Sequence, residues 1–206
     1  MIDKFCDFII QKIKNKVEDL DEEKELVIDF GVRLLFGETP KIILLIVIGF
    51  VLGIGWYTLL MFFFLVIYRS LTGGFHLKTH LGCMITTTAL YVGPVLLAKI
   101  IEIPNEYIKY ILAILIGIMS IIFITKYAPA DTENVPILSK KERKSKKIKA
   151  YIVLIGLLAI VLFVPDKVIS YMLIYGIFLQ NLTMTPIAYK ITNNKYGYQV
   201  YQEETI

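Results

Sequence analysis

The sequence predicts an all-α, polytopic integral membrane protein with about six membrane segments. Of its 206 residues, 56% are hydrophobic, and the mean hydropathy is +0.66. The hydrophobic share exceeds the apolar content of about half that is typical of soluble domains. The apolar residues also come in uncharged blocks about as long as the roughly 20-residue helix that crosses a bilayer. The blocks at 42–68 and 110–125 lack the alternating polarity of barrel strands, so a transmembrane barrel is excluded.

The amino-terminal part of the chain predicts amphipathic helices. Apolar residues recur every three or four positions over 2–20, with charged residues between them, which is the spacing of a helix with one apolar face. Such a helix lies on the membrane surface or packs on other protein segments, and both alternatives stay open. Cys6 lies among these apolar residues, so we expect it to be a buried small hydrophobic residue. A second helix is expected over 22–36, ending at the helix breaker Gly37-Glu38-Thr39-Pro40.

Hydropathy predicts four further membrane spans after one ambiguous stretch. The ambiguous stretch, 42–68, holds 27 residues without a charge, which is about 40 Å of helix against about 30 Å of hydrocarbon. It crosses the membrane once with a tilt, or it folds back as a hairpin that breaks near Gly53-Ile54-Gly55. The four later spans are 81–103, 107–125, 150–164 and 168–189.

The distribution of Lys and Arg predicts the orientation, because basic residues concentrate in cytoplasmic loops. The loop at 126–149 carries eight basic residues and the region 1–41 carries seven, so we expect both in the cytoplasm. The chain must then cross the membrane an even number of times before Arg69, which favours the hairpin. Each arm of the hairpin is short for a full crossing, so a re-entrant hairpin and recruitment of 26–36 into the first arm stay open.

A single multi-pass domain in the cell membrane is therefore expected over residues 1–206. Interfacial helices occupy 1–40, membrane segments with the basic loop occupy 41–189, and a tail occupies 190–206. Both termini are expected in the cytoplasm. Membrane lipid is an expected partner, and nucleic acid is not.

The most polar stretch beside an apolar block runs from Arg69 through S-L-T-G-G-F to His76, and Cys83 follows seven residues later. A thiol becomes a strong nucleophile where a nearby base or a helix amino terminus favours the thiolate. On one unbroken helix, residues seven apart are separated by about 10.5 Å along the axis and cannot touch. Gly73 and Gly74 permit a bend that folds His76 over the start of the next helix, with Cys83 in or near its first turn. Arg69 would then orient the substrate or stabilise an oxyanion, and the whole site would lie at the cytoplasmic face.

Three other interpretations of these residues stay open. His80 lies three residues before Cys83, so spacing on a helix makes it the simpler base. His76, His80 and Cys83 also form an H-x3-H-x2-C run that would suit a metal-dependent membrane hydrolase, although a clear fourth ligand is lacking. In the third interpretation, Cys83 is an apolar packing residue beside two interfacial histidines. No cofactor is predicted.

These residues resemble the accessory gene regulator protein B family (AgrB), the membrane cysteine peptidases of Gram-positive quorum sensing. The resemblance rests on R-S-L-T-G-G-F-H from Arg69, on the cysteine seven residues later, and on K-Y-A-P-A-D-T-E-N-V-P-I from Lys126 with the lysines after it. It covers nearly the whole chain. It implies Cys83 as nucleophile and His76 as base, with Arg69 and Gly74 also essential. No acidic residue stands nearby in the sequence, so a third catalytic group, if there is one, comes from elsewhere in the fold.

The resemblance also implies the substrate, which is a short precursor peptide like AgrD. The Cys83 thiolate would release the C-terminal tail and leave a thioester on the enzyme. A thiol or hydroxyl of the bound peptide would then close a thiolactone or lactone ring. The family further implies a homodimer. The alternative function is a non-catalytic membrane transporter or peptide exporter.

Two other groups of residues fit such a substrate, each with a second interpretation. The lysines of 140–149 attract an acidic tail or simply form a solvated loop that sets topology. Four polar residues of the last span line a peptide groove or form hydrogen bonds between helices: Gln180, Asn181, Thr183 and Thr185.

Overall fold

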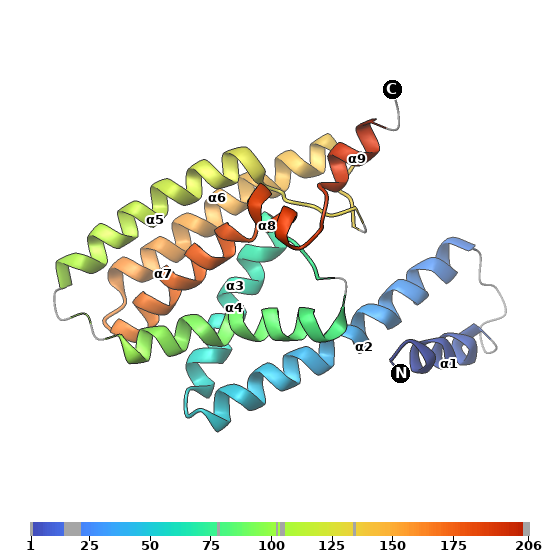
Figure 1. The fold of residues 1–206 in the computed structure, drawn as a ribbon, viewed down its shortest axis with the longest axis horizontal. Helices are drawn as coiled ribbons and strands as arrows, with labels where there is room; N and C mark the ends of the chain where they lie inside the picture. The colour runs from blue at the N-terminus through green and yellow to red at the C-terminus, as the bar shows by residue number, and fades with distance from the viewer. Residues whose placement is uncertain are drawn as a thin grey trace.

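The computed structural model describes residues 2–14, 22–77, 79–101, 103, 106–133 and 135–203. The regular elements in these ranges are all α-helices, as predicted (Figure 1). They are α1 (Ile2–Lys14), α2 (Glu22–Val51), α3 (Gly55–Thr72), α4 (His80–Ile100), α5 (Glu106–Tyr127), α6 (Lys140–Phe163), α7 (Lys167–Leu182), α8 (Pro186–Ile191) and α9 (Gly197–Glu203).

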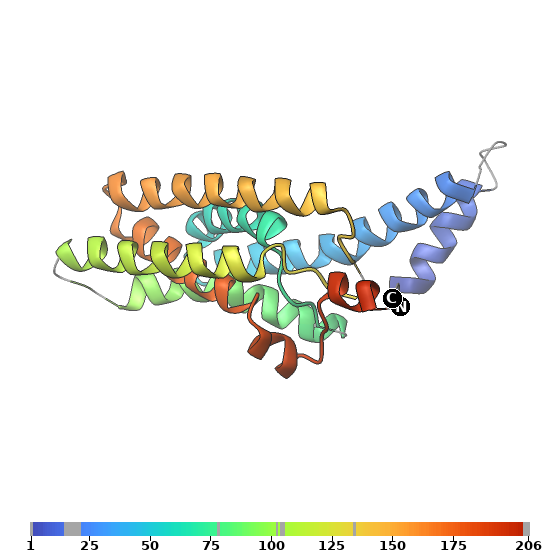
Figure 2. The same ribbon diagram turned by 90° about the horizontal axis from the view of Figure 1, so that it is seen from above.

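Helix α7 forms the centre of the bundle. It packs against α3, α4, α5 and α6, and nine of its sixteen residues are buried. Figures 1 and 2 show α5, α6 and α7 side by side along the long axis of the molecule. The carboxyl end of α7 therefore lies where loops from several neighbouring helices can meet.

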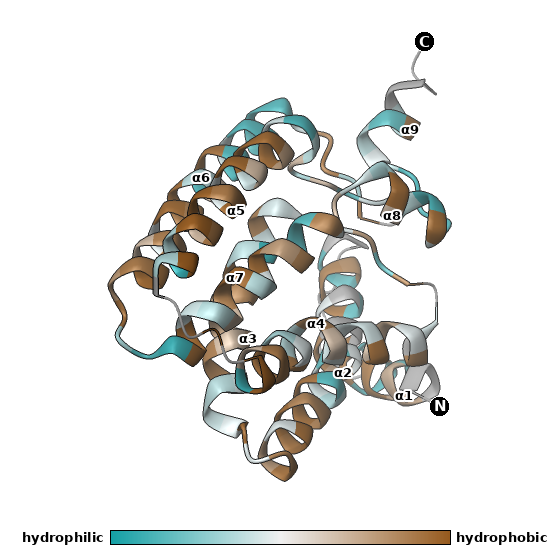
Figure 3. Ribbon diagram, turned by 60° about the vertical axis from the view of Figure 1, so that its left-hand side comes forward, coloured by the Kyte–Doolittle hydropathy of each residue, from teal (hydrophilic) through white to brown (hydrophobic). Residues whose placement is uncertain are grey.

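Hydrophobic residues predominate along the long helices (Figure 3), and many large apolar side chains on them are exposed. On α5 the exposed residues are spaced three or four apart and form one continuous face, which suits contact with lipid: Ile111, Ile114, Leu115, Ile118, Ile121 and Ile122. In the part of the chain that the structure describes, three helices are long and apolar enough to cross a membrane, namely Gly55–Thr72, Leu81–Ile100 and Tyr107–Tyr127. These features indicate a membrane protein, while the total of about six segments stays a prediction.

Helix α2 corrects the prediction that a helix ends at the breaker 37–40. The helix continues through Pro40 to Val51. A proline inside a helix removes one backbone hydrogen bond, but the residues after Pro40 form an apolar arm that packs on α3 and α4, with Leu45 fully buried. This packing offsets the lost hydrogen bond.

The chain turns between α2 and α3 at residues 52–54, close to the predicted break. Gly53 has a φ of +71°, a conformation that glycine adopts without steric cost. The N–H of Ile54 donates to the carbonyl of Gly49 at 2.9 Å and closes the turn. Whether each arm crosses the bilayer stays a prediction.

The predicted span 168–189 is divided into two helices. Helix α7 ends at Leu182, and α8 begins at Pro186. The residue before a proline avoids the helical conformation, and Thr185 has an extended backbone with ψ of 151° while its side chain accepts from Ala188 N–H. Helix α6 also starts earlier than the predicted 150, because Ser139 caps a helix that includes the basic residues from Lys140 onward.

The amino-terminal helix packs on protein in the structure. Helix α1 lies against α2, with the rings of Phe5 and Phe36 5.1 Å apart between centroids. Cys6 is 1% exposed, which confirms its prediction as a buried hydrophobic residue. The helix predicted over 2–20 is observed over Ile2–Lys14, and its remaining residues lie outside the described ranges.

Candidate active site

Arg69, in the last turn of α3, holds the chain that follows it. Its guanidinium donates to the carbonyl of Phe75 at 2.8 Å, to Gln180 Oε1 at 2.9 Å and to Thr183 Oγ1 at 3.2 Å. The planar guanidinium has several donors at fixed angles and can satisfy these acceptors together. Arg69 therefore ties the segment after α3 to the end of α7. Its predicted role toward a substrate stays a prediction.

Gly73 and Gly74 let the chain leave α3 along a path that other residues resist. Their φ angles are +74° and +142°, which favour glycine. The N–H of Gly74 donates to the carbonyl of Ala130 at 2.8 Å. A Cβ on Gly73 would overlap this carbonyl oxygen, and one on Gly74 would lie 2.5 Å from Thr183 Oγ1. The two glycines are thus required by both conformation and space.

Two fully buried amides of α7 fix the same corner from inside the bundle. Gln180 donates to the carbonyl of Gly73 at 2.7 Å. Asn181 donates to Ser120 Oγ on α5 at 2.6 Å and accepts from the Tyr68 hydroxyl on α3 at 2.9 Å. Both amides are 0% exposed. These contacts confirm interhelical hydrogen bonding for Gln180 and Asn181 and leave neither amide free to line a groove.

The loop after α5 is folded around a buried carboxylate. Asp131 Oδ2 accepts from the backbone N–H groups of Ile137 and Tyr198, each at 2.9 Å. Its Oδ1 lies 3.1 Å from Nη1 of Arg143. The Tyr189 hydroxyl donates to the Asp131 carbonyl at 3.0 Å. The loop that the sequence predicts in the cytoplasm therefore holds Ala130 in place, and the Ala130 carbonyl accepts from Gly74 N–H.

Cys83 lies in the first turn of α4, as predicted. The Thr79 hydroxyl caps this helix by accepting from Gly82 N–H at 3.2 Å, and the N–H of Cys83 donates to the Thr79 carbonyl at 2.9 Å. The Cys83 side chain is half-buried, and Lys41 Nζ donates to its sulfur at 3.6 Å. Cys83 and Cys6 are both free thiols.

His76 lies in the extended segment between α3 and α4. Its carbonyl accepts from Asn194 Nδ2 at 2.8 Å. The residue as a whole is exposed, although protein atoms surround the imidazole closely enough to desolvate it in part. Desolvation by the surrounding protein, and then repulsion from the Arg69 guanidinium, lower the pKa of His76 below its ordinary 6.5. The imidazole is therefore neutral at pH 7 and able to accept a proton.

The structure leaves the choice of base open. In the described part of the chain, no hydrogen bond joins the His76 ring to the Cys83 thiol, so their pairing stays a prediction. The side chain of His80 lies outside the described residues. Among the residues that are described, no group of three or more His, Cys, Asp or Glu could hold a metal ion. Because the H-x3-H-x2-C run includes His80, the metal interpretation is not tested by this finding.

Two charged residues beside the site come from α2, and sequence reasoning did not assign them to it. Glu38 Oε1 lies 2.6 Å from Lys41 Nζ, and Lys41 contacts the Cys83 sulfur. The Glu38 carboxylate also acts on His76, where it opposes the lowering of the pKa. It is an acidic group brought by the fold and not by sequence proximity. The one sequence feature that could have pointed to Lys41 is its position as the last charged residue before the uncharged block 42–68.

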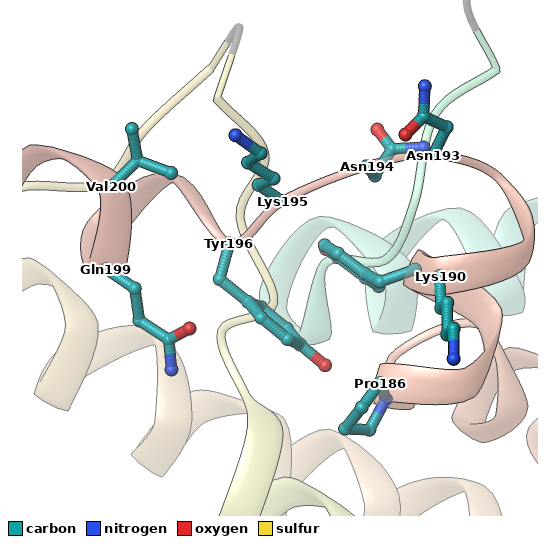
Figure 4. A pocket seen from close by; sticks show the side chains of 9 residues that line it. Pro186, Lys190, Asn193, Asn194, Lys195, Tyr196, Gln199 and Val200 are labelled. Carbon is teal, nitrogen blue, oxygen red and sulfur yellow. The ribbon is translucent and has the colours of Figure 1, made fainter.

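A surface hollow of about 450 Å³ is lined by residues of α8, of α9 and of the segment between them (Figure 4). Asn194 places this hollow beside the His76 segment, because it lines the hollow and donates to the His76 carbonyl. The stacked rings of Tyr189 and Tyr196 lie 4.1 Å apart between centroids. The lining residues combine amides, lysines and aromatic rings, which suits a polar peptide: Pro186, Tyr189, Lys190, Asn193, Asn194, Lys195, Tyr196, Gln199 and Val200.

Comparison with known proteins gives a consistent result. The sequence profile of the family described as Accessory gene regulator B matches residues 6–184. An AgrB-like protein of Clostridium acetobutylicum is 26% identical over 100% of this chain and 96% of its own length. The accessory gene regulator protein B of Staphylococcus intermedius is 27% identical over 91% and 95% of the two chains. An AgrB-like protein of Listeria welshimeri is 26% identical over 97% and 95%.

No solved structure gives a significant match. The profile match covers nearly the whole chain, including the segment from Arg69 to Cys83 and the loop after α5. The chain therefore belongs to the Accessory gene regulator B family.

Proposed function

We propose that this protein is a membrane-embedded cysteine endopeptidase that removes the C-terminal tail of an AgrD-like quorum-sensing precursor and promotes its cyclisation. The observation that carries the proposal is the position of Cys83, in the capped first turn of α4 with its sulfur 3.6 Å from Lys41 Nζ. A helix amino terminus and a nearby cation both favour the thiolate. Membership of the family supports involvement in accessory gene regulator quorum sensing.

The first half of the proposed reaction removes the tail. His76 takes the proton from Cys83 Sγ, and the thiolate attacks the carbonyl carbon that ends the signal portion of the peptide. A C–S bond forms and the carbonyl oxygen becomes an oxyanion. When the carbonyl re-forms, the C–N bond breaks and the leaving amine takes the proton held by His76. The products are the free tail and a thioester on Cys83.

The second half closes the ring. A thiol or hydroxyl within the bound peptide attacks the thioester carbonyl, and its proton passes to the Cys83 sulfur as the C–S bond to the enzyme breaks. Cyclisation must be faster than hydrolysis by water. A nucleophile held in position reaches effective molarities of about 10⁵ M or more in favourable cases, and a site with limited water access adds to this advantage.

Arg69, Gly73 and Gly74 support this chemistry by holding the His76 segment. The three acceptors of Arg69 are protein groups, so we assign it a positioning role through the carbonyl of Phe75. The conformation of the glycine pair then directs the chain from α3 toward α4. These contacts fix the backbone while His76 itself stays exposed.

The hollow beside His76 is the proposed binding site for part of the precursor. Lys190 and Lys195 line it and would attract a peptide segment rich in carboxylates. In this proposal the protein is a multi-pass protein of the cell membrane, contacts lipid, and has its site and both termini in the cytoplasm. It acts as a homodimer. The exporter alternative draws less support, because Gln180 and Asn181, two polar residues of the last predicted span that could line a transport path, are bonded to neighbouring helices.

The experiment uses purified protein in liposomes, a synthetic precursor peptide and mass spectrometry. The parent protein should release the tail and form the cyclic product, and Cys6→Ser should behave like the parent because Cys6 is buried between α1 and α2. Cys83→Ala should form neither product. Undiminished tail release by Cys83→Ala would overturn the proposal. Uptake of uncleaved peptide into the liposome lumen by the parent would favour an exporter instead.

A further inference from the structure

Lys41 is placed unlike a lysine that only sets membrane topology. The residue is 8% exposed and is therefore one of the buried polar residues in the part of the chain that the structure describes. A topogenic lysine keeps its ammonium in water or among lipid headgroups. Burial of an ammonium requires compensating partners, so the groups that surround Lys41 indicate its role.

The partners of Lys41 are one carboxylate and one sulfur. Nζ lies 2.6 Å from Glu38 Oε1 and 3.6 Å from Cys83 Sγ. The Glu38 contact lies within α2 and provides one negative charge. The Cys83 contact joins α2 to α4 across 42 positions of sequence, so it is made by the tertiary fold. A neutral thiol is a weak acceptor, whereas a thiolate is a strong partner for an ammonium.

We propose that Lys41 is a catalytic residue whose ammonium pairs with the Cys83 thiolate and thereby stabilises the nucleophilic form of the sulfur. This inference rests on the proposed peptidase function. The proton still moves from Sγ to His76, and Lys41 keeps its own protons. Its positive charge stabilises the negative sulfur that this transfer creates. Glu38 orients the ammonium toward the sulfur.

The test measures alkylation of Cys83 in the absence of any peptide. Cys6→Ser serves as the background, so that Cys83 is the remaining cysteine of the chain. The rate of iodoacetamide modification is followed by mass spectrometry between pH 5 and pH 10. Lys41→Met should slow modification at pH 7 about tenfold, because the sulfur loses the positive charge beside it.

Two further variants control this result. Lys41→Arg keeps the charge and should retain a pH profile close to that of the parent. Lys99→Met removes an exposed lysine at the far end of α4 and should leave the profile unchanged. A parent-like profile in Lys41→Met would overturn the inference, and so would a profile in Lys41→Arg that matches Lys41→Met.

A second measurement applies if Lys41→Met does not fold. Anionic and cationic methanethiosulfonate reagents are compared on the parent and on Lys41→Gln, because a fixed positive charge beside the sulfur favours the anionic reagent. The preference should fall at least about threefold in Lys41→Gln, and an unchanged preference would contradict the inference. Because no substrate is used, these results are independent of the proposed reaction. If Cys83→Ala still releases the tail, the peptidase proposal fails while the Lys41 effect on alkylation can still be measured.

Discussion

The two ends of the segment between α3 and α4 are held to very different degrees. At the α3 end, Arg69 donates three hydrogen bonds and Gly74 pairs with Ala130. At the α4 end, His76 is exposed and the contact to the Cys83 sulfur is a 3.6 Å hydrogen bond from Lys41. At the fixed end, the polar groups of Arg69 and Gly74 are hydrogen-bonded within the protein and hold the backbone in place. The open end carries the exposed His76 and the half-buried Cys83 thiol, which are the proposed base and nucleophile.

The largest expected effect comes from the open end and separates its two histidines. His76→Ala should reduce tail release by about 10² to 10⁴-fold, the usual contribution of a general base. His80→Ala should keep most of the activity. Both variants are assayed with the precursor peptide by mass spectrometry. The opposite ranking would make His80 the base, and the base and the thiol would then both lie on α4.

A smaller effect is expected from the fixed end. Gly73→Ala places a Cβ against the Ala130 carbonyl at a φ of +74°, so we expect a loss of about 2 kcal/mol in the free energy of unfolding. Tail release should fall about tenfold because the His76 segment shifts. Activity and thermal midpoint in detergent are measured together.

Gly156→Ala is the matched control for this substitution. Gly156 lies inside α6, and a Cβ there would meet nothing within 4 Å. Alanine in place of glycine in a helix interior stabilises by up to about 1 kcal/mol. Equal losses of stability in Gly73→Ala and Gly156→Ala would show that the Gly73 position is no more constrained than an ordinary helix position.

The smallest effect concerns pH. Because the pKa of His76 is lowered below 6.5, the imidazole stays neutral at pH 7 and becomes protonated only at more acidic pH. The acid limb of tail release should therefore have its half-maximal point below pH 6.5. A half-maximal point above pH 6.5 would contradict this assignment.

Glu38→Gln sharpens the same measurement. The Glu38 carboxylate raises the pKa of His76 against the larger opposing effects, so its removal should move the acid limb to lower pH, by less than about one unit. Glu133→Gln, in the loop after α5, is the control and should leave the limb in place. A shift to higher pH in Glu38→Gln would show that the carboxylate does not face the imidazole.

Local sequence rules predicted the features that depend on neighbouring residues. Cys83 falls in the first turn of a helix because a loop ends at Thr79, which caps it. Gly73 and Gly74 mark the bend because their positions need conformations and space that other residues lack. The division of the last span was also available locally, since Pro186 excludes Thr185 from a helix.

Features that depend on packing were beyond these rules. Helix α2 continues through Pro40 because its apolar arm packs on α3 and α4. Lys41 approaches Cys83 only because this arm lies beside the start of α4, and no spacing rule joins residues 42 positions apart. The position of a charge at the edge of an apolar block predicted topology, whereas its burial and its partners came from the fold.

The most direct test of the account is detection of the acyl-enzyme on Cys83. A precursor whose ring-closing residue is replaced by Ala lacks the second nucleophile, so the thioester should accumulate and leave only by slow hydrolysis. Mass spectrometry should find the signal portion attached to Cys83 in the parent and in Cys6→Ser, and hydroxylamine should release it. Cys83→Ser should give little or no adduct, because a serine hydroxyl is a much weaker nucleophile than a thiolate. Tail release that continues in Cys83→Ala, with no adduct in the parent, would contradict the account and would make Cys83 a packing residue.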